Sequence, residues 1–512
     1  DIRCNRANAA LDLGDAAAAL ADFQAACAAD PEHAAARWGA CFARLPVGFE
    51  AEADIAPARA AYAEALAGLE AWLDADPARQ IRAADQAAGN LQPFYLTYQG
   101  QNDRPLQARY GALLARVMAA RHPDLARPPA ARRRTAPGDR LRVGVCSAFF
   151  HEHSVWKIPT RGWLAGLDRK RFAVTGLYCG APQDACTEEA RALCDDFVHE
   201  PGNLERLVRA ARERELDAVL FPEVGMAPLT ARAAALRLAP VQAVGLGHPM
   251  TTGLPTMDYF LSCDCMEPET GAEAWYTERL VRLPGASLWY EPIRRAAPPL
   301  TRADFGLPED AVLLFSPQSL FKYLPRHDAF FPRTAAAAGA GADGVRCVFV
   351  FVEHRRAARL TARFRARLER AFAAAGLAPD RHMVLLPHQP PERYRALTAC
   401  CDAFLDSLGW SGFNTAMEAA EAGLPMLTCP GDCLRARHAL AVVRGLGLDD
   451  AVAADPDQYV AMAARLARDR AWRADLAERV RAAAPRLWRD AAPIRALEAW
   501  LEAAVAEAAG RS

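Results

Sequence analysis

The stretch that decides the fold runs from residue 403 to residue 425 and reads AFLDSLGWSGFNTAMEAAEAGLP. Its first three residues are apolar and predict a short buried strand. Gly409 and Gly412 predict a loop after that strand, because glycine lets the backbone turn sharply and approach a neighbour closely. A helix is predicted to begin near Asn414 and Thr415. A strand, a loop and a helix in this order form the repeating unit of a parallel α/β sheet.

The same unit recurs on both sides of this stretch. Apolar strand-like runs alternate with helical segments, which predicts parallel sheets covered by helices on both faces. A proline-rich stretch over residues 284–299 divides the runs into two series. The expected strands are 141–146, 172–178, 216–221, 241–246 and 259–262, followed by 312–316, 345–351, 383–386, 403–405 and 425–428. The sequence therefore predicts an α/β protein with two doubly wound domains.

The N-terminal part has a different pattern. Small residues and turn residues recur at the spacing of one tetratricopeptide helical hairpin: Ala9, Gly14, Asp15, Ala18, Ala26, Asp30 and Pro31. One such hairpin cannot bury its own apolar face, so we expect it to stack on the helices that follow or on repeats upstream of Asp1, as the end of a truncated repeat array. A plain alanine-rich helical bundle is the alternative.

These patterns divide the chain into four expected segments. Residues 1–50 form the tetratricopeptide-like hairpin, and residues 51–136 form a helical linker region that ends in a Pro/Arg-rich stretch. Residues 137–295 and 296–512 form the two α/β domains, the second with additional C-terminal helices.

Composition excludes several classes of protein. The 512 residues carry a net charge of −1, so no overall field attracts nucleic acid or an anionic membrane. No apolar run is long enough to cross a bilayer. The 14 cysteines include no CxxC pair, which favours buried free thiols in a reducing cytoplasm over disulfides or a metal site.

Lysine use singles out a second motif. Of the 61 lysines and arginines only Lys157, Lys170 and Lys322 are lysine, so a retained lysine suggests that a compact ammonium is needed. Lys322 lies in residues 316–325, SPQSLFKYLP, directly after the first strand of the second series. An ammonium there could stabilise the phosphate of a departing nucleotide.

The loop and helix start at residues 412–418 suit the same chemistry. The N–H groups and the dipole of a helix start attract a diphosphate, and Asn414 and Thr415 could cap the helix and donate to phosphate oxygens. Glu418 lies about one turn further on, where its carboxylate could accept the ribose hydroxyls. An ordinary capped helix start is the alternative.

Two loops of the first series carry histidines. His151 and His153 follow the first strand and are candidates for acid–base chemistry or for contacts to sugar hydroxyls. Zinc is the competing idea, although no third ligand is in sight. His248 and Thr251 lie in a glycine-containing loop after another strand, which suits the wall of a cleft between the domains.

On these residues the chain resembles the O-linked N-acetylglucosamine transferase/SPINDLY family, glycosyltransferase family 41, and especially its bacterial SPINDLY-like members. The resemblance covers about residues 140–505 together with the N-terminal hairpin. It implies a GT-B fold, in which two Rossmann-like domains face a cleft. Residues 137–295 would then form the acceptor side and residues 296–512 the nucleotide-sugar side.

The resemblance also implies site residues. The phosphate-contacting lysine of the family corresponds to Lys322 in QSLFKYLP, which begins at Gln318. The nucleotide loop corresponds to residues 412–418, with Phe413 in place of a histidine and Glu418 in place of an aspartate. The base-binding residues and the active-site histidine correspond to Gln389, Tyr394 and His153, although a gap-free alignment places Glu152 at the last position.

The implied activity is an inverting, metal-independent transfer of N-acetylglucosamine from UDP-GlcNAc to Ser/Thr hydroxyls of proteins, with no cofactor. The protein acceptor would bind through the tetratricopeptide segment and the cleft. Two alternatives remain open at this point. One is a protein O-fucosyltransferase that uses GDP-fucose, and the other is a non-catalytic scaffold that binds nucleotide-sugars.

Overall fold

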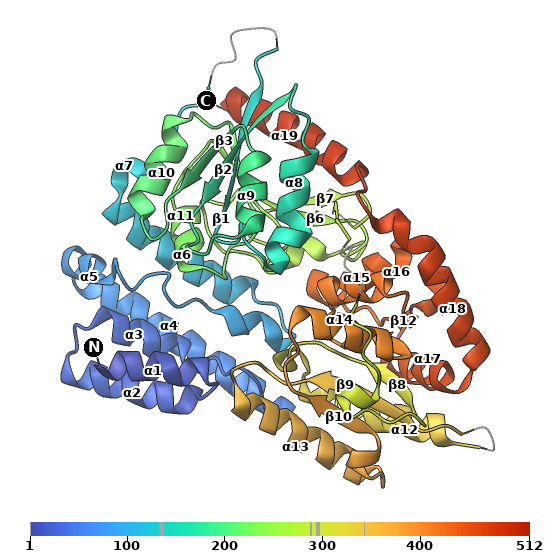
Figure 1. The fold of residues 1–512 in the computed structure, drawn as a ribbon. Coiled ribbons are helices and arrows are strands. Elements are labelled where there is room, and N and C mark those ends of the chain that lie inside the picture. The colour runs from blue at the N-terminus through green and yellow to red at the C-terminus, as the bar shows by residue number, and fades with distance from the viewer. Residues whose placement is uncertain (1, 133–137, 287–288, 293–296, 342–343, 512) are drawn as a thin grey trace.

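The computed structural model describes residues 2–132, 138–286, 289–292, 297–341 and 344–511. It contains a helical N-terminal region and two α/β halves, each built on its own parallel sheet (Figure 1). The expected boundaries at residues 136/137 and 295/296 lie outside the described residues. Of the helices among these residues, none is long and apolar enough to cross a membrane.

The N-terminal region begins with a helical hairpin. Helices α1 (Ile2–Asp12) and α2 (Ala16–Ala29) pack against each other across a turn in which Gly14 has a φ of +80°. The side chain of Asp15 caps α2 by accepting a hydrogen bond from the N–H of Ala18 (3.2 Å). The remaining elements of this region are α3 (Ala34–Phe42), the 3-10 helix η1 (Glu52–Asp54), α4 (Ile55–Ala75), α5 (Pro77–Ala84), the 3-10 helix η2 (Phe94–Gln99), α6 (Arg104–Arg121) and α7 (Pro123–Ala126).

The first α/β half is built on a seven-stranded parallel sheet in the order β3-β2-β1-β4-β5-β6-β7, the order of a doubly wound nucleotide fold. Its strands are β1 (Leu141–Ser147), β2 (Phe172–Tyr178), β3 (Asp196–His199), β4 (Ala218–Phe221), β5 (Val241–Val244), β6 (Tyr259–Cys263) and β7 (Arg279–Leu283). Its helices are α8 (Arg161–Gly166), α9 (Ala185–Ala192), α10 (Leu204–Glu213) and α11 (Pro228–Ala234). The sequence did not predict β3 and β7.

The second half repeats this topology in a five-stranded parallel sheet, β10-β9-β8-β11-β12. Its strands are β8 (Val312–Phe315), β9 (Cys347–Val352), β10 (Met383–Leu386), β11 (Ala403–Leu405) and β12 (Met426–Leu427). Its helices are α12 (Phe330–Gly339), α13 (Ala358–Ala374), α14 (Pro391–Cys400), α15 (Phe413–Glu421), α16 (His438–Gly445), α17 (Pro456–Arg468) and α18 (Arg470–Ala483). The expected strand–loop–helix of residues 403–425 is present as β11 and α15.

The last helix, α19 (Ala492–Arg511), returns to the first half (Figure 1). Ile494, Leu497 and Leu501 are buried in the same apolar core as β1 and β2. The sequence assigned this segment to the second domain, because position in the chain alone gave no sign of the return. Beside this crossing, the N–H of Arg489 donates to the carbonyl of Tyr290 (3.0 Å), so the two segments that join the halves run next to each other.

A buried ion cluster joins the three parts of the chain. Arg59 and Asp103 of the helical region form an ion pair (2.8 Å), and Arg435 of the second half lies 3.2 Å from the other oxygen of Asp103. The Arg435 guanidinium also lies 5.2 Å from the ring centroid of Trp275, in the first half. Asp103 is 1% exposed and Arg435 is 4% exposed. Burial raises the pKa of the Asp103 carboxyl, and the two arginines oppose this effect.

We expect Asp103→Asn to lower the free energy of unfolding by about 3–5 kcal/mol, because two buried guanidinium groups lose their counter-charge. Thermal and urea unfolding measure the change. Glu205→Gln is the matched control: it breaks an exposed i,i+4 pair with Arg209, which contributes less than about 1 kcal/mol. Equal losses in the two variants would contradict a structural role for the buried cluster.

Candidate functional site

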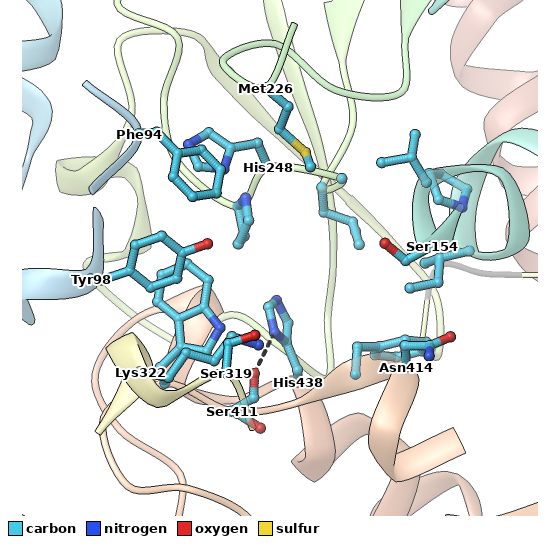
Figure 2. A pocket seen from close by; sticks show the side chains of 18 of the residues that line it. Phe94, Tyr98, Ser154, Met226, His248, Ser319, Lys322, Ser411, Asn414 and His438 are labelled. Atoms are coloured by element: carbon cyan, nitrogen blue, oxygen red, sulfur yellow. Dashed lines mark hydrogen bonds between the residues drawn. The ribbon is translucent and has the colours of Figure 1, made fainter. Parts of the chain in front are cut away.

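A cleft of about 280 Å³ lies where the three parts of the chain meet (Figure 2). The helical region contributes Phe94 and Tyr98 to its lining. The first half contributes Ser154, from the helical turn before α8, and Met226 and His248 from loops. The second half contributes the loop after β8 and the start of α15 and α16, with Lys322, Asn414 and His438. The carboxyl ends of parallel strands are where ligands bind in such folds.

Lys322 is held at the cleft by a chain of hydrogen bonds. Its Nζ donates to Oε1 of Gln318 (2.9 Å), and Nε2 of Gln318 donates to Oγ1 of Thr415 at the start of α15. The ammonium also lies 5.6 Å from the ring centroid of Trp410. Burial lowers the pKa of Lys322 to about 8, while the charge of Asp406 acts in the opposite direction. The group is therefore a cation at neutral pH, joined through Gln318 to the helix start.

The loop before α15 is shaped by a buried carboxylate. Asp406 accepts hydrogen bonds from the N–H of Gly412 (2.9 Å), from Oγ of Ser411 (2.6 Å) and from Oγ1 of Thr428 (2.8 Å). Burial raises the pKa of Asp406 to about 6, against these hydrogen bonds. The N–H of Gly412 is thus already bonded to Asp406. The groups of this helix start that can bind an anion are the N–H groups of the residues after Gly412.

The prediction that Asn414 and Thr415 cap α15 was wrong. Gly412 is the N-cap residue, and no side chain caps this helix start. Thr415 instead accepts from Gln318, and Nδ2 of Asn414 donates to Oε1 of Glu418 (2.9 Å). Both side chains therefore bond to neighbours within the second half. Glu418 lies one helical turn after Asn414, and Gln318 follows the end of β8, the strand next to β11.

Gly412 allows the close approach on which this arrangement depends. A Cβ atom at this position would lie 1.8 Å from Nε2 of Gln318 and 2.3 Å from Oγ1 of Thr415. These distances are far below van der Waals contact. Only glycine leaves room for the Gln318–Thr415 hydrogen bond, which connects the β8 loop to α15.

The expected base- and ribose-binding residues lie beside the cleft. Burial raises the pKa of Glu418, and the positive charge of Lys157 from the first half opposes this effect. Tyr394 lies on α14 with its ring 5.7 Å from that of Phe315. Gln389 follows β10, where its Nε2 donates to the carbonyl of Pro387 (2.7 Å). These three residues are not among those that line the cleft of Figure 2.

The histidines of the first half differ in their positions. The His153 ring stacks on Phe149 (4.2 Å between centroids), and its Nδ1 accepts from the N–H of Val155, so it lies beside the cleft-lining Ser154. Burial lowers the pKa of His153 to about 4, helped by the charges of His151 and Lys157. His151 contacts the hydroxyl of Tyr178 (3.2 Å) and does not line the cleft.

His248 and Thr251 also differ in position, because only His248 lines the cleft. His248 lines the cleft, stacks on Phe94 (5.1 Å between centroids) and is 2% exposed. Thr251 is buried away from the cleft lining, where its hydroxyl donates to Glu278 (2.6 Å). The structure thus brings Lys322, Asn414 and His248 to one cavity, with Gln318 and Thr415 directly behind Lys322.

Several cleft residues were missed by the sequence analysis. Phe94 and Tyr98 belong to a run of aromatic residues, FYLTYQ, inside an otherwise alanine-rich region. That run was a usable signal, because a cluster of aromatic residues between polar helices needs a partner surface. His438 follows residues 430–437 and gave no signal of its own, since only the folded chain brings it beside Ser411.

Comparison with known proteins identifies the second half. The model of glycosyl transferase family 41 matches residues 291–487, which include Lys322 and the whole of α15. Over these residues the chain is similar to glycosyltransferase family 41. Curated relatives include the probable UDP-N-acetylglucosamine–peptide N-acetylglucosaminyltransferase SPINDLY of Solanum lycopersicum, with 29% identity over 65% of this chain and 35% of the relative. The match therefore spans about a third of the length of that relative.

The chain is also similar to two other proteins. The UDP-glucose:protein N-beta-glucosyltransferase of Actinobacillus pleuropneumoniae is 30% identical over 30% of this chain and 24% of its own length. A mutant of the O-GlcNAc transferase of Thermobaculum terrenum has a similar fold, with a TM-score of 0.69 and 22% identity over 100% of this chain and 98% of that structure. The expected GT-B architecture, two parallel-sheet domains behind a helical segment, is confirmed.

The geometry at Gly412 gives a testable consequence. Gly412→Ala should displace the Gln318 side chain and destabilise the fold by about 1–3 kcal/mol, because the new methyl group overlaps Gln318. Thermal unfolding measures this loss. Gly68→Ala, on the open surface of α4, is the control and should leave stability unchanged or slightly raised. A Gly412→Ala variant as stable as the control would show that Gln318 does not need this space.

Proposed function

We propose that this chain is a family-41 glycosyltransferase that transfers N-acetylglucosamine from UDP-GlcNAc to Ser/Thr hydroxyls of a protein, with inversion at the anomeric carbon and without a metal ion. The observation that carries the proposal is the position of Lys322. Its ammonium lies at the cleft and is joined through Gln318 to Thr415, at the start of α15. A cation and a helix N-terminus that converge on one cavity suit a diphosphate.

The proposed reaction is a direct displacement. The acceptor hydroxyl oxygen forms a bond to the anomeric carbon while the bond from that carbon to the β-phosphate oxygen breaks. The negative charge that develops on the diphosphate is stabilised by Lys322 and by the first turn of α15. The hydroxyl proton passes to a base, for which we propose His153, because its imidazole is neutral at pH 7 and next to the cleft-lining Ser154.

Several features support the other parts of the proposal. The helical region supplies part of the cleft wall, which favours its participation in acceptor binding. All 14 cysteines are free thiols, which fits a reducing cytoplasm.

Calorimetric titration with UDP and with GDP tests the nucleotide. We expect UDP to bind and GDP to bind at least about tenfold more weakly, with the same result in the presence of EDTA. Preference for GDP would favour fucose as the sugar. Failure of the protein to bind either nucleotide, together with absence of slow UDP-GlcNAc hydrolysis, would contradict the transferase proposal. Nucleotide binding without any transfer or hydrolysis would instead favour a scaffold.

Replacement of the cleft lysine tests the role of the ammonium. Lys322→Ala should reduce sugar transfer by about 10²–10³-fold or more, the usual cost of losing one group that stabilises transition-state charge. Circular dichroism and thermal unfolding should show an intact fold. Lys170→Ala is the matched control, since Lys170 is an exposed lysine that is not among the residues lining the cleft. Near-normal transfer by Lys322→Ala would overturn the phosphate assignment.

The lowered pKa of Lys322 predicts a pH dependence. Because the free protein holds this pKa at about 8, the ammonium loses its proton as the pH rises through 8. UDP binds the protonated form better, so its affinity should fall above about pH 8, approaching tenfold per pH unit. Titrations between about pH 7 and pH 9 measure the slope. Lys322→Arg, which stays charged, should show a flatter profile, and identical profiles would contradict this origin.

A further inference from the structure

His438 presents an unused hydrogen-bond acceptor to the cleft. It is the first residue of α16, is 6% exposed, and lines the cavity beside Lys322 and Asn414 (Figure 2). Its Nδ1 lies 3.0 Å from the carbonyl oxygen of Ser411, whereas its Nε2 has no hydrogen-bond partner within the described chain. A buried polar atom without a partner is costly, so one that faces a cavity indicates a place where a ligand, an ion or a water binds.

The hydrogen bond to Ser411 fixes which nitrogen carries the proton. A carbonyl oxygen can only accept, so Nδ1 must be the donor. Burial lowers the pKa of His438 to about 4, against the bond to Ser411, and the charge of Lys322 further disfavours the cation. The imidazole is therefore neutral at pH 7, and Nε2 exposes a lone pair to the cavity.

Further contacts fix Ser411, the partner of the ring, and the ring itself. The N–H of Ala439 donates to Oγ of Ser411 (2.6 Å), and the N–H of Ser411 donates to the carbonyl of Arg435 (2.7 Å). The ring of Phe413 lies edge-on at 6.4 Å between centroids. His438 thus lies directly beside the loop that leads into α15.

We propose that His438 Nε2 accepts a hydrogen bond from a hydroxyl of the transferred sugar and so helps to select the donor. This inference rests on the proposed function. If the diphosphate occupies Lys322 and the first turn of α15, the sugar is the next part of the donor to enter the cavity.

The chemistry of the cavity favours a neutral acceptor at this point. No carboxylate is among the described residues that line the cleft. A carboxylate next to the diphosphate would repel it, whereas a neutral imidazole accepts a hydroxyl proton without adding negative charge. His248, the other lining histidine whose Nε2 lacks a partner among the described residues, approaches from the first half, opposite the diphosphate side.

Two substitutions test the roles of Nδ1 and Nε2 of His438 separately. In His438→Asn, the side-chain amide reaches the place of Nδ1 and can still donate to Ser411, but no atom replaces Nε2. In His438→Gln, the amide extends to the place of Nε2 and can restore an acceptor. Calorimetry with UDP and with UDP-GlcNAc then measures nucleotide and sugar contacts separately.

We expect His438→Asn to bind UDP like the wild type and to bind UDP-GlcNAc about tenfold more weakly, the effect of one hydrogen bond. His438→Gln should recover part of this loss. UDP-GlcNAc analogues that each lack one hydroxyl identify the bonded group, because one analogue should weaken binding to the wild type but not to His438→Asn.

The remaining outcomes overturn the assignment. Unchanged affinity for UDP-GlcNAc in His438→Asn, an equal loss for UDP and UDP-GlcNAc, or an effect confined to the KM of the protein acceptor would each do so. Failure of the wild-type protein to bind UDP and UDP-GlcNAc is a different result, since it contradicts the proposed function itself.

Discussion

The structure depends on one buried cation, the guanidinium of Arg435. It pairs with Asp103 of the helical region and lies over Trp275 of the first half, while its own backbone carbonyl accepts from Ser411. A buried charge is stable only when it is paired, so the three parts of the chain are held in one arrangement by the requirement to satisfy it. The cleft exists because these parts meet, and the loop beside Arg435 forms its floor.

The need to pair a buried charge also determines the shape of the cleft floor. Asp406 is a buried carboxylate at the end of β11, and its hydrogen bonds to Ser411, Gly412 and Thr428 determine the path of the loop. Gln318 then passes over Gly412 to reach Thr415, which brings Lys322 to the helix start. The position of the Lys322 ammonium therefore follows from buried polar groups that need hydrogen-bond partners. Local helix propensity contributes little to it.

Much of this architecture could be predicted from the sequence, because buried parallel strands leave continuous apolar runs. The missed strands β3 and β7 lie at the two edges of the first sheet, and exposed or half-exposed residues such as Asp196 and Arg279 interrupt their apolar pattern. The motifs around Lys322 and Gly412 could be recognised because each is local. Tertiary contacts decided the rest: Phe94, Tyr98 and His438 reach the cleft only through packing between distant segments, and the bond between Asp406 and Gly412 is invisible in a pattern of residue types.

The return of α19 to the first half has a mechanical consequence. The chain crosses between the halves twice, and the two crossings are joined by the hydrogen bond from Arg489 to Tyr290 and by the ion pair of Arg489 with Glu291. Because the two crossings are tied to each other, they constrain how the halves can move relative to one another, in addition to the constraint from the Arg435 cluster.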